Sequence, residues 1–374
     1  MVKIQLETPF KAGLQLRRYP VNKNETLQAW DSADELLLEH LAQQGPDALK
    51  GKRILIINDQ FGALSCALQG FEMTTYTDSY VAARAMELNS RGAVKPIHDL
   101  KELSGKYDLV LIKLPKNASF FEDCLAHLTK HLSSGSQVIS ASMVKHMAKA
   151  SFDHLQKYIG TTTTSLAEKK ARLIFAPFQK GPVDSPYPIH VEMDSFEVKF
   201  VNHSNLFSRE RLDIGTRFLL ENIPTGDFKT ILDLGCGNGI LGIQARKRNP
   251  LARIIFSDES AMALQSAKIN FERQFPDSAA SAEYHWTNCS EDQTPDSVDL
   301  VLCNPPFHQQ NTIGDFIAWQ MFTDAQKAMK IGGLIRVIGN LHLGYDAKLK
   351  RIFGNSKVVA SNPKFMIIDS KKYK

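Results

Sequence analysis

The 374-residue sequence contains no run of about 18 consecutive apolar residues, which excludes an ordinary membrane-spanning helix. Its first twenty residues contain no continuous apolar stretch after the early lysine, so we expect no secretory signal. No low-complexity tract is present, and a composition of 43% apolar and 23% charged residues excludes disordered and collagen-like classes. A chain of this length is expected to form about two domains.

Cysteine is scarce, and its spacing excludes several kinds of site. Five cysteines without a C-x-x-C pair are too few for a disulfide scaffold and suggest neither a zinc ribbon nor a thioredoxin-type centre. We expect no metal site, and we expect reduced thiols in a cytoplasmic, monomeric protein that does not contact a membrane. The five are Cys66, Cys124, Cys236, Cys289 and Cys303.

Charge is unevenly distributed beneath a formal net charge of +5. Residues 101–180 contain 12 Lys and Arg against 6 Asp and Glu, and residues 336–374 contain 9 against 2. Residues 191–335 contain 13 against 19. Two basic segments therefore flank an acidic middle, which suits a phosphate-rich partner, although charge alone favours a solvated surface.

Two halves are predicted on either side of a proline-rich segment. Four prolines between residues 177 and 190 interrupt any helix or central strand. We therefore expect one domain over residues 1–185 and another over residues 186–374.

Strand-like and helix-like segments alternate in the second half, which predicts an α/β fold with a mostly parallel sheet and helices on both faces. The expected strands cover residues 230–233, 253–257, 298–303 and 334–339. The expected helices cover residues 240–248, 261–271 and 316–329.

The first half repeats this order with expected strands at 52–58, 73–78 and 108–114. Residues 54–64 (ILIINDQFGAL) align without gaps on residues 231–241 (ILDLGCGNGIL), and YDLVLIKLPKN matches VDLVLCNPPFH. We interpret this as a domain duplication. The first copy has Asn58 and Gln60 where the second has Gly235 and Gly237, so we expect cofactor binding in the second copy only.

A glycine-rich turn is predicted between the first strand and first helix of the second half. Gly235, Gly237 and Gly239 permit positive φ and close approach of a ligand to the backbone. Asp233 places a carboxylate just before the turn, which suits the cationic methionine end of S-adenosylmethionine and would repel a pyrophosphate. Residues 237–242 also satisfy G-x-G-x-x-G, so dinucleotide binding and a ligand-free turn are alternatives at this point.

Acidic residues end the next expected strand. Asp258 lies 19 residues after Gly239 and is followed by Glu259. Ligands of doubly wound sheets bind beyond the carboxyl ends of the strands, so these side chains are placed to accept hydrogen bonds from ribose hydroxyls.

A second motif, Asn304-Pro305-Pro306-Phe307, follows the expected strand at 298–303. Its prolines stiffen the loop and remove two backbone donors, leaving the Asn304 side-chain oxygen and the Pro305 carbonyl as acceptors. Two convergent acceptors suit an exocyclic amine, and Phe307 offers a face for a planar base. The alternative is a simple strand-ending turn.

The combination of DLGCGNG (233–239), SDES (257–260) and NPPF (304–307) resembles class I S-adenosylmethionine-dependent N-methyltransferases. The duplicated layout, LFSRERLDIGTRFLL (206–220) and NPPFHQQ (304–310) further resemble the ribosomal RNA guanine-N2 methyltransferases, and the N-terminal stretches resemble those acting on the large subunit. The resemblance covers nearly the whole chain. It implies N2 methylation of a guanine in 23S rRNA, with tandem Rossmann-like domains of which the first is degenerate.

Further site residues are expected with less specific signals. Asn288 is expected to meet the adenine ring, and Phe207 either packs against the cofactor or fills the core. Lys169, Lys170 and Arg172 are candidates for RNA phosphate contacts or form a solvated face. The alternative functions are a 16S rRNA guanine-N2 methyltransferase, a catalytically silent RNA-binding assembly protein, and an NAD-dependent oxidoreductase, which leaves NPPF unexplained.

Overall fold

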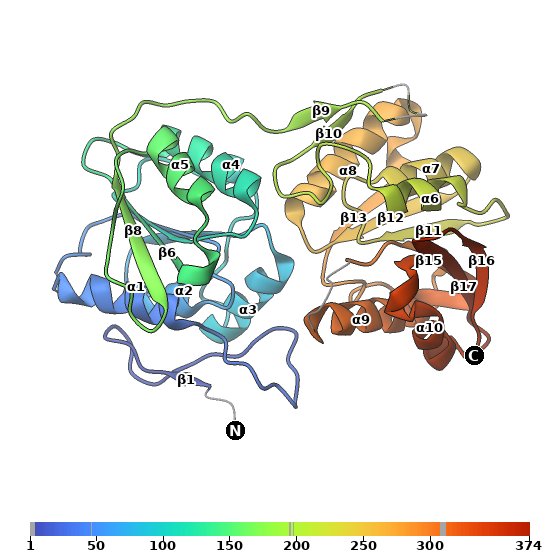
Figure 1. Ribbon diagram of the computed structural model, residues 1–374, viewed down its shortest axis with the longest axis horizontal. Coiled ribbons are helices and arrows are strands. Elements are labelled where there is room, and N and C mark those ends of the chain that lie inside the picture. The colour runs from blue at the N-terminus through green and yellow to red at the C-terminus, as the bar shows by residue number, and fades with distance from the viewer. Residues whose placement is uncertain (1–3, 46, 194–195, 197, 307–311) are drawn as a thin grey trace. The chain divides into compact units, whose positions relative to one another are not determined.

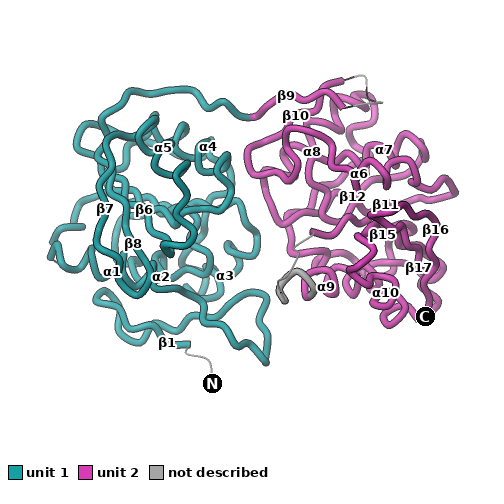
Figure 2. The backbone as a smooth tube through the Cα atoms, viewed as in Figure 1, with its two compact units in different colours: residues 1–187 teal, residues 188–374 magenta. Residues whose placement is uncertain are grey.

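The chain folds into two compact units, Met1–Tyr187 (unit 1) and Pro188–Lys374 (unit 2), as Figure 2 shows. The computed structural model describes residues 4–45, 47–193, 196, 198–306 and 312–374. Each unit is described by itself below.

Unit 1 contains one large sheet with helices on both faces (Figure 1). Its strands are β1 (Gln5–Leu6), β2 (Leu14–Gln15), β3 (Ile54–Ile57), β4 (Met73–Tyr76), β5 (Leu109–Lys113), β6 (Gln137–Met143), β7 (Thr163–Thr164) and β8 (Ala171–Pro177). Its helices are α1 (Ser32–Gln43), α2 (Ala63–Ala67), α3 (Tyr80–Ser90), α4 (Ala118–Leu128) and α5 (Lys149–Tyr158), with short 3-10 turns η1 (Leu100–Glu102), η2 (Thr129–His131) and η3 (Val144–His146).

Unit 2 has the same architecture with one additional strand at the sheet edge. Its strands are β9 (Ile189–Val191), β10 (Phe200–Asn202), β11 (Thr230–Leu234), β12 (Arg253–Asp258), β13 (Ala282–Trp286), β14 (Val298–Cys303), β15 (Met329–Asn340), β16 (Lys357–Ser361) and β17 (Phe365–Lys371). Its helices are α6 (Ile214–Glu221), α7 (Ile240–Arg248), α8 (Ala261–Gln274), α9 (Thr312–Ala328) and α10 (Tyr345–Phe353), with η4 (Pro276–Ser281) and η5 (Leu341–Leu343).

The two large sheets have matching strand orders. Unit 1 has the order β4-β3-β5-β6-β8-β7, and unit 2 has β13-β12-β11-β14-β15-β17-β16. Strands β4, β3, β5 and β6 of unit 1 pair in parallel, as do β13, β12, β11, β14 and β15 of unit 2. The last two strands of each order join their sheet by antiparallel pairing with their neighbours. The expected α/β class with two tandem Rossmann-like domains is confirmed, and the antiparallel edge is an addition that the sequence patterns did not predict.

Equivalent side chains perform equivalent structural tasks in the two sheets, which supports the duplication. Asp108 accepts a hydrogen bond from the Arg53 amide at 2.8 Å, and Asp299 accepts one from the Thr230 amide at 2.8 Å. The two aspartates occupy equivalent positions, because each directly precedes the residue of its strand that pairs with the first isoleucine of the neighbouring strand. Leu109 pairs with Ile54 in unit 1, and Leu300 pairs with Ile231 in unit 2. The two copies therefore match in contacts as well as in element order.

The sheet of unit 2 is buried on both faces because its strands are nearly continuous apolar runs. Helices α6, α7 and α8 cover one face and α9 and α10 cover the other (Figure 1). Leu300 and Leu302 pack under α6, α7 and α8, whereas Val301 and Cys303 pack under α9 and α10. Because side chains alternate between the two faces, the same pattern predicts the face of the sheet on which a residue directly after a strand lies.

Most expected elements occur close to their predicted positions. Helix α7 and strand β14 coincide with the predicted residues 240–248 and 298–303. The helix expected at 316–329 ends at Ala328 instead, because Met329 begins β15 and pairs with Val298. Among the described helices, none combines the length and apolar character that crossing a bilayer requires.

Candidate functional site

The glycine-rich turn joins β11 to α7 in a backbone conformation that ordinary residues rarely adopt. Gly235, Gly237 and Gly239 have φ values of +72°, +55° and +82°. The sequence argument for glycine is therefore realised in the backbone itself. Asn58 and Gly62 hold the equivalent left-handed positions in unit 1, with φ of +63° and +86°.

The three glycines have different surroundings. A Cβ atom on Gly239 would lie 3.0 Å from the Ala267 Cα, so this glycine permits close packing of α7 against α8. A Cβ on Gly237 would meet no described atom within 4 Å. Open space on that side of the turn fits a ligand that approaches the Gly237 backbone, as S-adenosylmethionine would do.

Asp233 lies beneath the turn rather than on its open side. It is fully buried, and its Oδ2 accepts a hydrogen bond from the Gly242 amide at 2.8 Å. Burial raises the pKa of Asp233 to about 8, and the nearby Asp258 charge adds to this increase. The side chain therefore organises the start of α7, and its expected contact with the cationic end of the cofactor stays a prediction.

Asp258, the first residue of the acidic pair predicted after the second strand, contacts the same turn. Asp258 Oδ2 accepts from the Gly237 amide at 2.9 Å, and its Oδ1 accepts from the Ser260 amide at 2.9 Å. Glu259 is half-buried, and its backbone carbonyl accepts the indole N–H of Trp286 at 2.8 Å. Asp258 is thus tied to the turn and close to the ligand side of its backbone.

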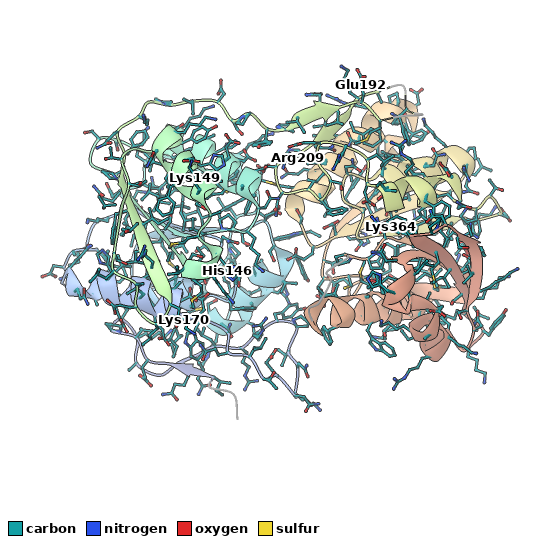
Figure 3. All side chains as sticks on the ribbon, in the orientation of Figure 1. His146, Lys149, Lys170, Glu192, Arg209 and Lys364 are labelled. Atoms are coloured by element: carbon teal, nitrogen blue, oxygen red, sulfur yellow. The ribbon has the colours of Figure 1, made fainter. Side chains whose placement is uncertain are left out.

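Two further candidates lie near this edge of unit 2. Asn288 is buried just after β13, and its Nδ2 donates to Glu291 at 3.2 Å. Phe207 belongs to the segment between β10 and α6 and is 73% exposed, so it does not fill the core of this unit. Asn202 secures that segment by donating to the Arg209 carbonyl at 2.7 Å and by accepting from Asn238 of the turn at 3.1 Å (Arg209 is labelled in Figure 3).

Asn304 begins the second motif directly after β14. Its Nδ2 donates to Thr216 Oγ1 at 2.9 Å on α6. Its Oδ1 is buried and has no hydrogen-bond partner among the described residues. A buried carbonyl oxygen without a partner is unfavourable, so this atom is prepared to accept a donor from a bound molecule.

The orientation of the Asn304 amide follows from a chain of three groups. Asp213 caps α6, and its Oδ2 accepts from the Thr216 amide at 2.9 Å and from the Thr216 hydroxyl at 3.3 Å. A carboxylate only accepts, so the Thr216 hydroxyl must donate its proton to Asp213. The Thr216 oxygen then accepts from Asn304 Nδ2, which leaves Oδ1 as the unpaired end. Sequence reasoning missed Asp213 and Thr216, although both lie in the segment 206–220 that carried the family resemblance.

Unit 1 contains the same arrangement with different side chains. Lys113 takes the place of Asn304, and its Nζ forms ion pairs with Asp31 at 2.7 Å and Asp34 at 2.8 Å. Asp31 caps α1 as Asp213 caps α6, and Asp34 takes the place of Thr216. Burial lowers the pKa of Lys113, but the two carboxylates outweigh this effect and raise it, so the ammonium stays charged. The equivalent site in unit 1 is filled by its own side chains.

The remaining residues of the second motif are described only in part. Pro305 is buried and Pro306 is exposed. Phe307 and its neighbour His308 lie outside the described residues, so the expected stacking face is a prediction. The predicted acceptor role of the Pro305 carbonyl also stays a prediction.

The basic residues predicted for RNA lie at the carboxyl end of β6 in unit 1. Lys169 and Lys170 form the two-residue turn between Glu168 and Ala171, with φ of +46° and +65°. Both lysines are exposed, and Lys169 forms an ion pair with Glu35 at 3.1 Å. Arg172 is half-buried within β8.

No group of three or more potential metal-binding side chains (His, Cys, Asp or Glu) is placed to hold an ion among the described residues. The site of unit 2 therefore consists of the glycine turn, the acids at the end of β12, and Asn304 at the end of β14. All three lie at the carboxyl edge of one parallel sheet, where doubly wound folds bind their ligands.

Comparisons with known proteins agree with this geometry. A family model described as the RLMG N-terminal domain matches residues 3–180, and one described as the Methyltransferase small domain matches residues 197–369. The ribosomal RNA large subunit methyltransferase G of Stutzerimonas stutzeri is 45% identical, covering 98% of this chain and 99% of that protein. The protein of the same name from Psychromonas ingrahamii is 43% identical over 96% and 97% of the two chains.

A solved structure shares the whole architecture. It is the T. thermophilus 16S rRNA N2 methyltransferase in complex with AdoMet and guanosine, which matches with a TM-score of 0.76 and 18% identity over 96% of each chain. The fold and the site define a class I methyltransferase with a tandem, duplicated architecture. The chain belongs to the ribosomal RNA large subunit methyltransferase G family. The enzyme class expected from the sequence is confirmed.

Proposed function

We propose that the protein transfers a methyl group from S-adenosylmethionine to the exocyclic N2 amine of one guanine in 23S rRNA. The observation that carries this proposal is the buried, unpaired Oδ1 of Asn304 at the carboxyl edge of the unit 2 sheet. The large-subunit substrate follows from the names of relatives that match the chain over nearly its full length.

The chemistry requires orientation more than activation. When bound, S-adenosylmethionine supplies an electrophilic methyl group on its sulfonium. The guanine amine is a poor nucleophile because its lone pair is delocalised into the ring. A hydrogen bond from this amine to Asn304 Oδ1 would orient the nitrogen towards the methyl group and stabilise the positive charge that develops on it during transfer. Thr216 and Asp213 hold the amide in the orientation that this requires.

The turn residues fit the cofactor by their placement. Gly237 leaves open space where its side chain would be, and its amide is held by Asp258. We propose that Gly235, Gly237, Gly239, Asp258, Glu259, Asn288 and Phe207 form the cofactor site, with Asp233 supporting it.

Methyl transfer to rRNA from a strain that lacks the enzyme tests the proposal. We expect incorporation into 23S rRNA at one guanine, located by mass mapping, and loss of roughly 10²-fold or more in rate for Asn304→Ala. Affinity for S-adenosylmethionine should stay within a few-fold of the wild type. Asn222→Ala, at the far end of α6, is the matched control. Incorporation into 16S rRNA instead would favour the small-subunit alternative, and binding of rRNA without transfer would favour an assembly protein.

We further propose that unit 2 alone holds the cofactor. In the equivalent turn of unit 1, the buried Asp59 accepts from the Gly62 and Ser65 amides at 3.1 and 2.8 Å, and Gln60 stands where unit 2 has Gly237. Lys113 fills the neighbouring position. Calorimetry on the full chain should give one S-adenosylmethionine per chain, and a stoichiometry of two would contradict this assignment.

We also propose that unit 1 contacts RNA phosphates. The η3 basic surface, defined as Lys145, His146, Lys149 and Lys170, brings residues from three segments together (three of these are labelled in Figure 3). The Val144 amide donates to the Lys170 carbonyl at 2.8 Å, which places the lysine turn beside η3. Left-handed lysines are strained, and strain of this kind is common where a side chain has a task.

A further inference from the structure

We propose that Asn340 is a second reader of the target base, and that its side-chain oxygen accepts the N1–H of guanine while Asn304 accepts from the 2-amino group. This inference rests on the proposed function and states how the same site selects guanine. It assigns a specificity role to a residue outside both sequence motifs.

The register of the sheet places the two asparagines on one face. Asn340 ends β15, the parallel neighbour of β14, and the pairing sets Asn304 level with Ile338. Alternate residues of a strand share a face, and both Ile338 and Leu302 pack under α6, α7 and α8. Asn304 and Asn340 therefore emerge on the same side. From strand spacing and rise, their Cα atoms are about 8 Å apart.

Helix α6 runs with its first turn over this position. Arg336 of β15 donates to the Asn222 carbonyl, which places the end of α6 beside Arg336. Phe365 is paired with Asn340 in β17, and a Cβ on Gly215 would lie 3.2 Å from the Phe365 ring. Asn340 thus lies beside the first turn of α6. Thr216 of the same turn holds the amide of Asn304.

Asn340 shares a property with Asn304. It is 8% exposed, and its Oδ1 is buried without a hydrogen-bond partner among the residues that the structure describes. Such an atom destabilises the protein unless a ligand or a water molecule supplies a donor. Two unpaired carbonyl oxygens at the ends of adjacent strands match a ligand edge that presents two adjacent donors.

Guanine presents such an edge. Its N1–H and its 2-amino group are neighbouring donors, whereas adenine has an acceptor at N1. A single amide acceptor serves any planar amine, so Asn304 by itself does not distinguish the two bases. An acceptor for N1–H does distinguish guanine from adenine, because a base without that proton leaves the buried oxygen of Asn340 unpaired.

The degenerate copy has lost both acceptors. In unit 1 the register of β5 and β6 places Lys113 at the position of Asn304 and Met143 at the position of Asn340. Met143 is half-buried and packs against the core of unit 1. Unit 1, which lacks the glycine-rich turn, thus also has the apolar Met143 where unit 2 has the side-chain oxygen of Asn340.

Binding of three nucleosides to the full chain loaded with S-adenosylhomocysteine tests the inference. Guanosine has both donors, inosine has N1–H without the amine, and 2-aminopurine riboside has the amine without N1–H. We expect Asn340→Ala to weaken guanosine and inosine roughly tenfold and not to weaken 2-aminopurine riboside, whose N1 has no proton to donate. Asn304→Ala should weaken guanosine and 2-aminopurine riboside and leave inosine unchanged.

Controls separate recognition from folding. Asn340→Asp preserves an acceptor of the same shape and should retain guanosine and inosine binding, whereas Asn222→Ala should change none of the three. An Asn340→Ala variant that weakens all three nucleosides equally, or none, would overturn the inference. A wild-type protein that shows no preference for guanosine would instead contradict the proposed function.

Discussion

At the scale of single residues, the site depends on an amide whose two ends have different partners. Thr216 holds the nitrogen of Asn304, and the target base is proposed to meet the oxygen. Neither motif in the sequence indicates this contact, because 88 positions separate the two residues. Only the fold brings them together, and only the Asp213 carboxylate determines which way the hydroxyl and the amide point.

Replacing Thr216 by valine should therefore slow methylation without preventing folding. The variant keeps the shape of the side chain but removes the acceptor for Asn304, so the amide is free to turn. We expect the rate of transfer to 23S rRNA to fall roughly 10- to 100-fold, with S-adenosylmethionine affinity unchanged. Thr216→Ser should restore most of the rate. If serine fails to rescue, the hydroxyl does not position the amide.

Asp233 should make stability decrease as pH rises. Its pKa is about 8 in the folded chain against an ordinary value of 3.8, so the unfolded chain loses this proton first. The contribution of Asp233 to the free energy of unfolding is fully favourable below pH 4, declines as pH rises, and is lost above about pH 8. Asp233→Asn removes this titration and keeps an acceptor for the Gly242 amide. The Tm of the variant relative to wild type should rise between pH 5 and pH 9, and a constant difference would contradict the assignment.

At the scale of elements, sequence patterns predicted what local chemistry determines. Helix α7 was predicted correctly because Gly239 precedes it and Asn249-Pro250 follows it. The antiparallel strands β16 and β17 were not predicted, and the place of β17 beside β15 depends on contacts between segments about 30 residues apart. Asn340 was not predicted either, because it follows no motif and only the register of β15 reveals its face.

The glycines of the turn should separate binding from stability. Gly237→Ala adds a methyl group in open space, so we expect about 1 kcal/mol of destabilisation from the left-handed backbone and a large loss of S-adenosylmethionine affinity. Gly239→Ala adds its methyl group against the Ala267 backbone, so its main effect should be a larger fall in Tm. Calorimetry and thermal unfolding measure the two effects. Equal affinity for wild type and Gly237→Ala would exclude the ligand from that side of the turn.

At the scale of the whole molecule, the two units are expected to divide chemistry and RNA contact. The acidic stretch 191–335 belongs to the unit that carries Asn304, whereas residues 101–180 supply a net positive charge in the other. Phosphate contacts position RNA without reading its sequence, so unit 1 would add affinity and placement rather than base recognition.

Reversing the charge of Lys145, Lys149 and Lys170 should therefore weaken binding to 23S rRNA and flatten its dependence on salt by roughly one unit of slope for each lost phosphate contact. S-adenosylmethionine affinity should not change. Reversal of Lys50 and Lys52, which precede β3 at the opposite strand ends, is the control. An unchanged salt slope in the triple variant would place the RNA contacts elsewhere.

The ion pairs of Lys113 have a consequence for the history of the duplicated gene. Removing this lysine alone would leave two buried or half-buried carboxylates facing each other, at a cost of about 3–5 kcal/mol. Such a loss is a large part of the stability of an average domain. A single substitution therefore cannot reopen the first copy, because Asp31, Asp34 and Lys113 would have to change nearly at once. The triad would therefore keep the first copy in its present state, because every single step away from it passes through a destabilised protein.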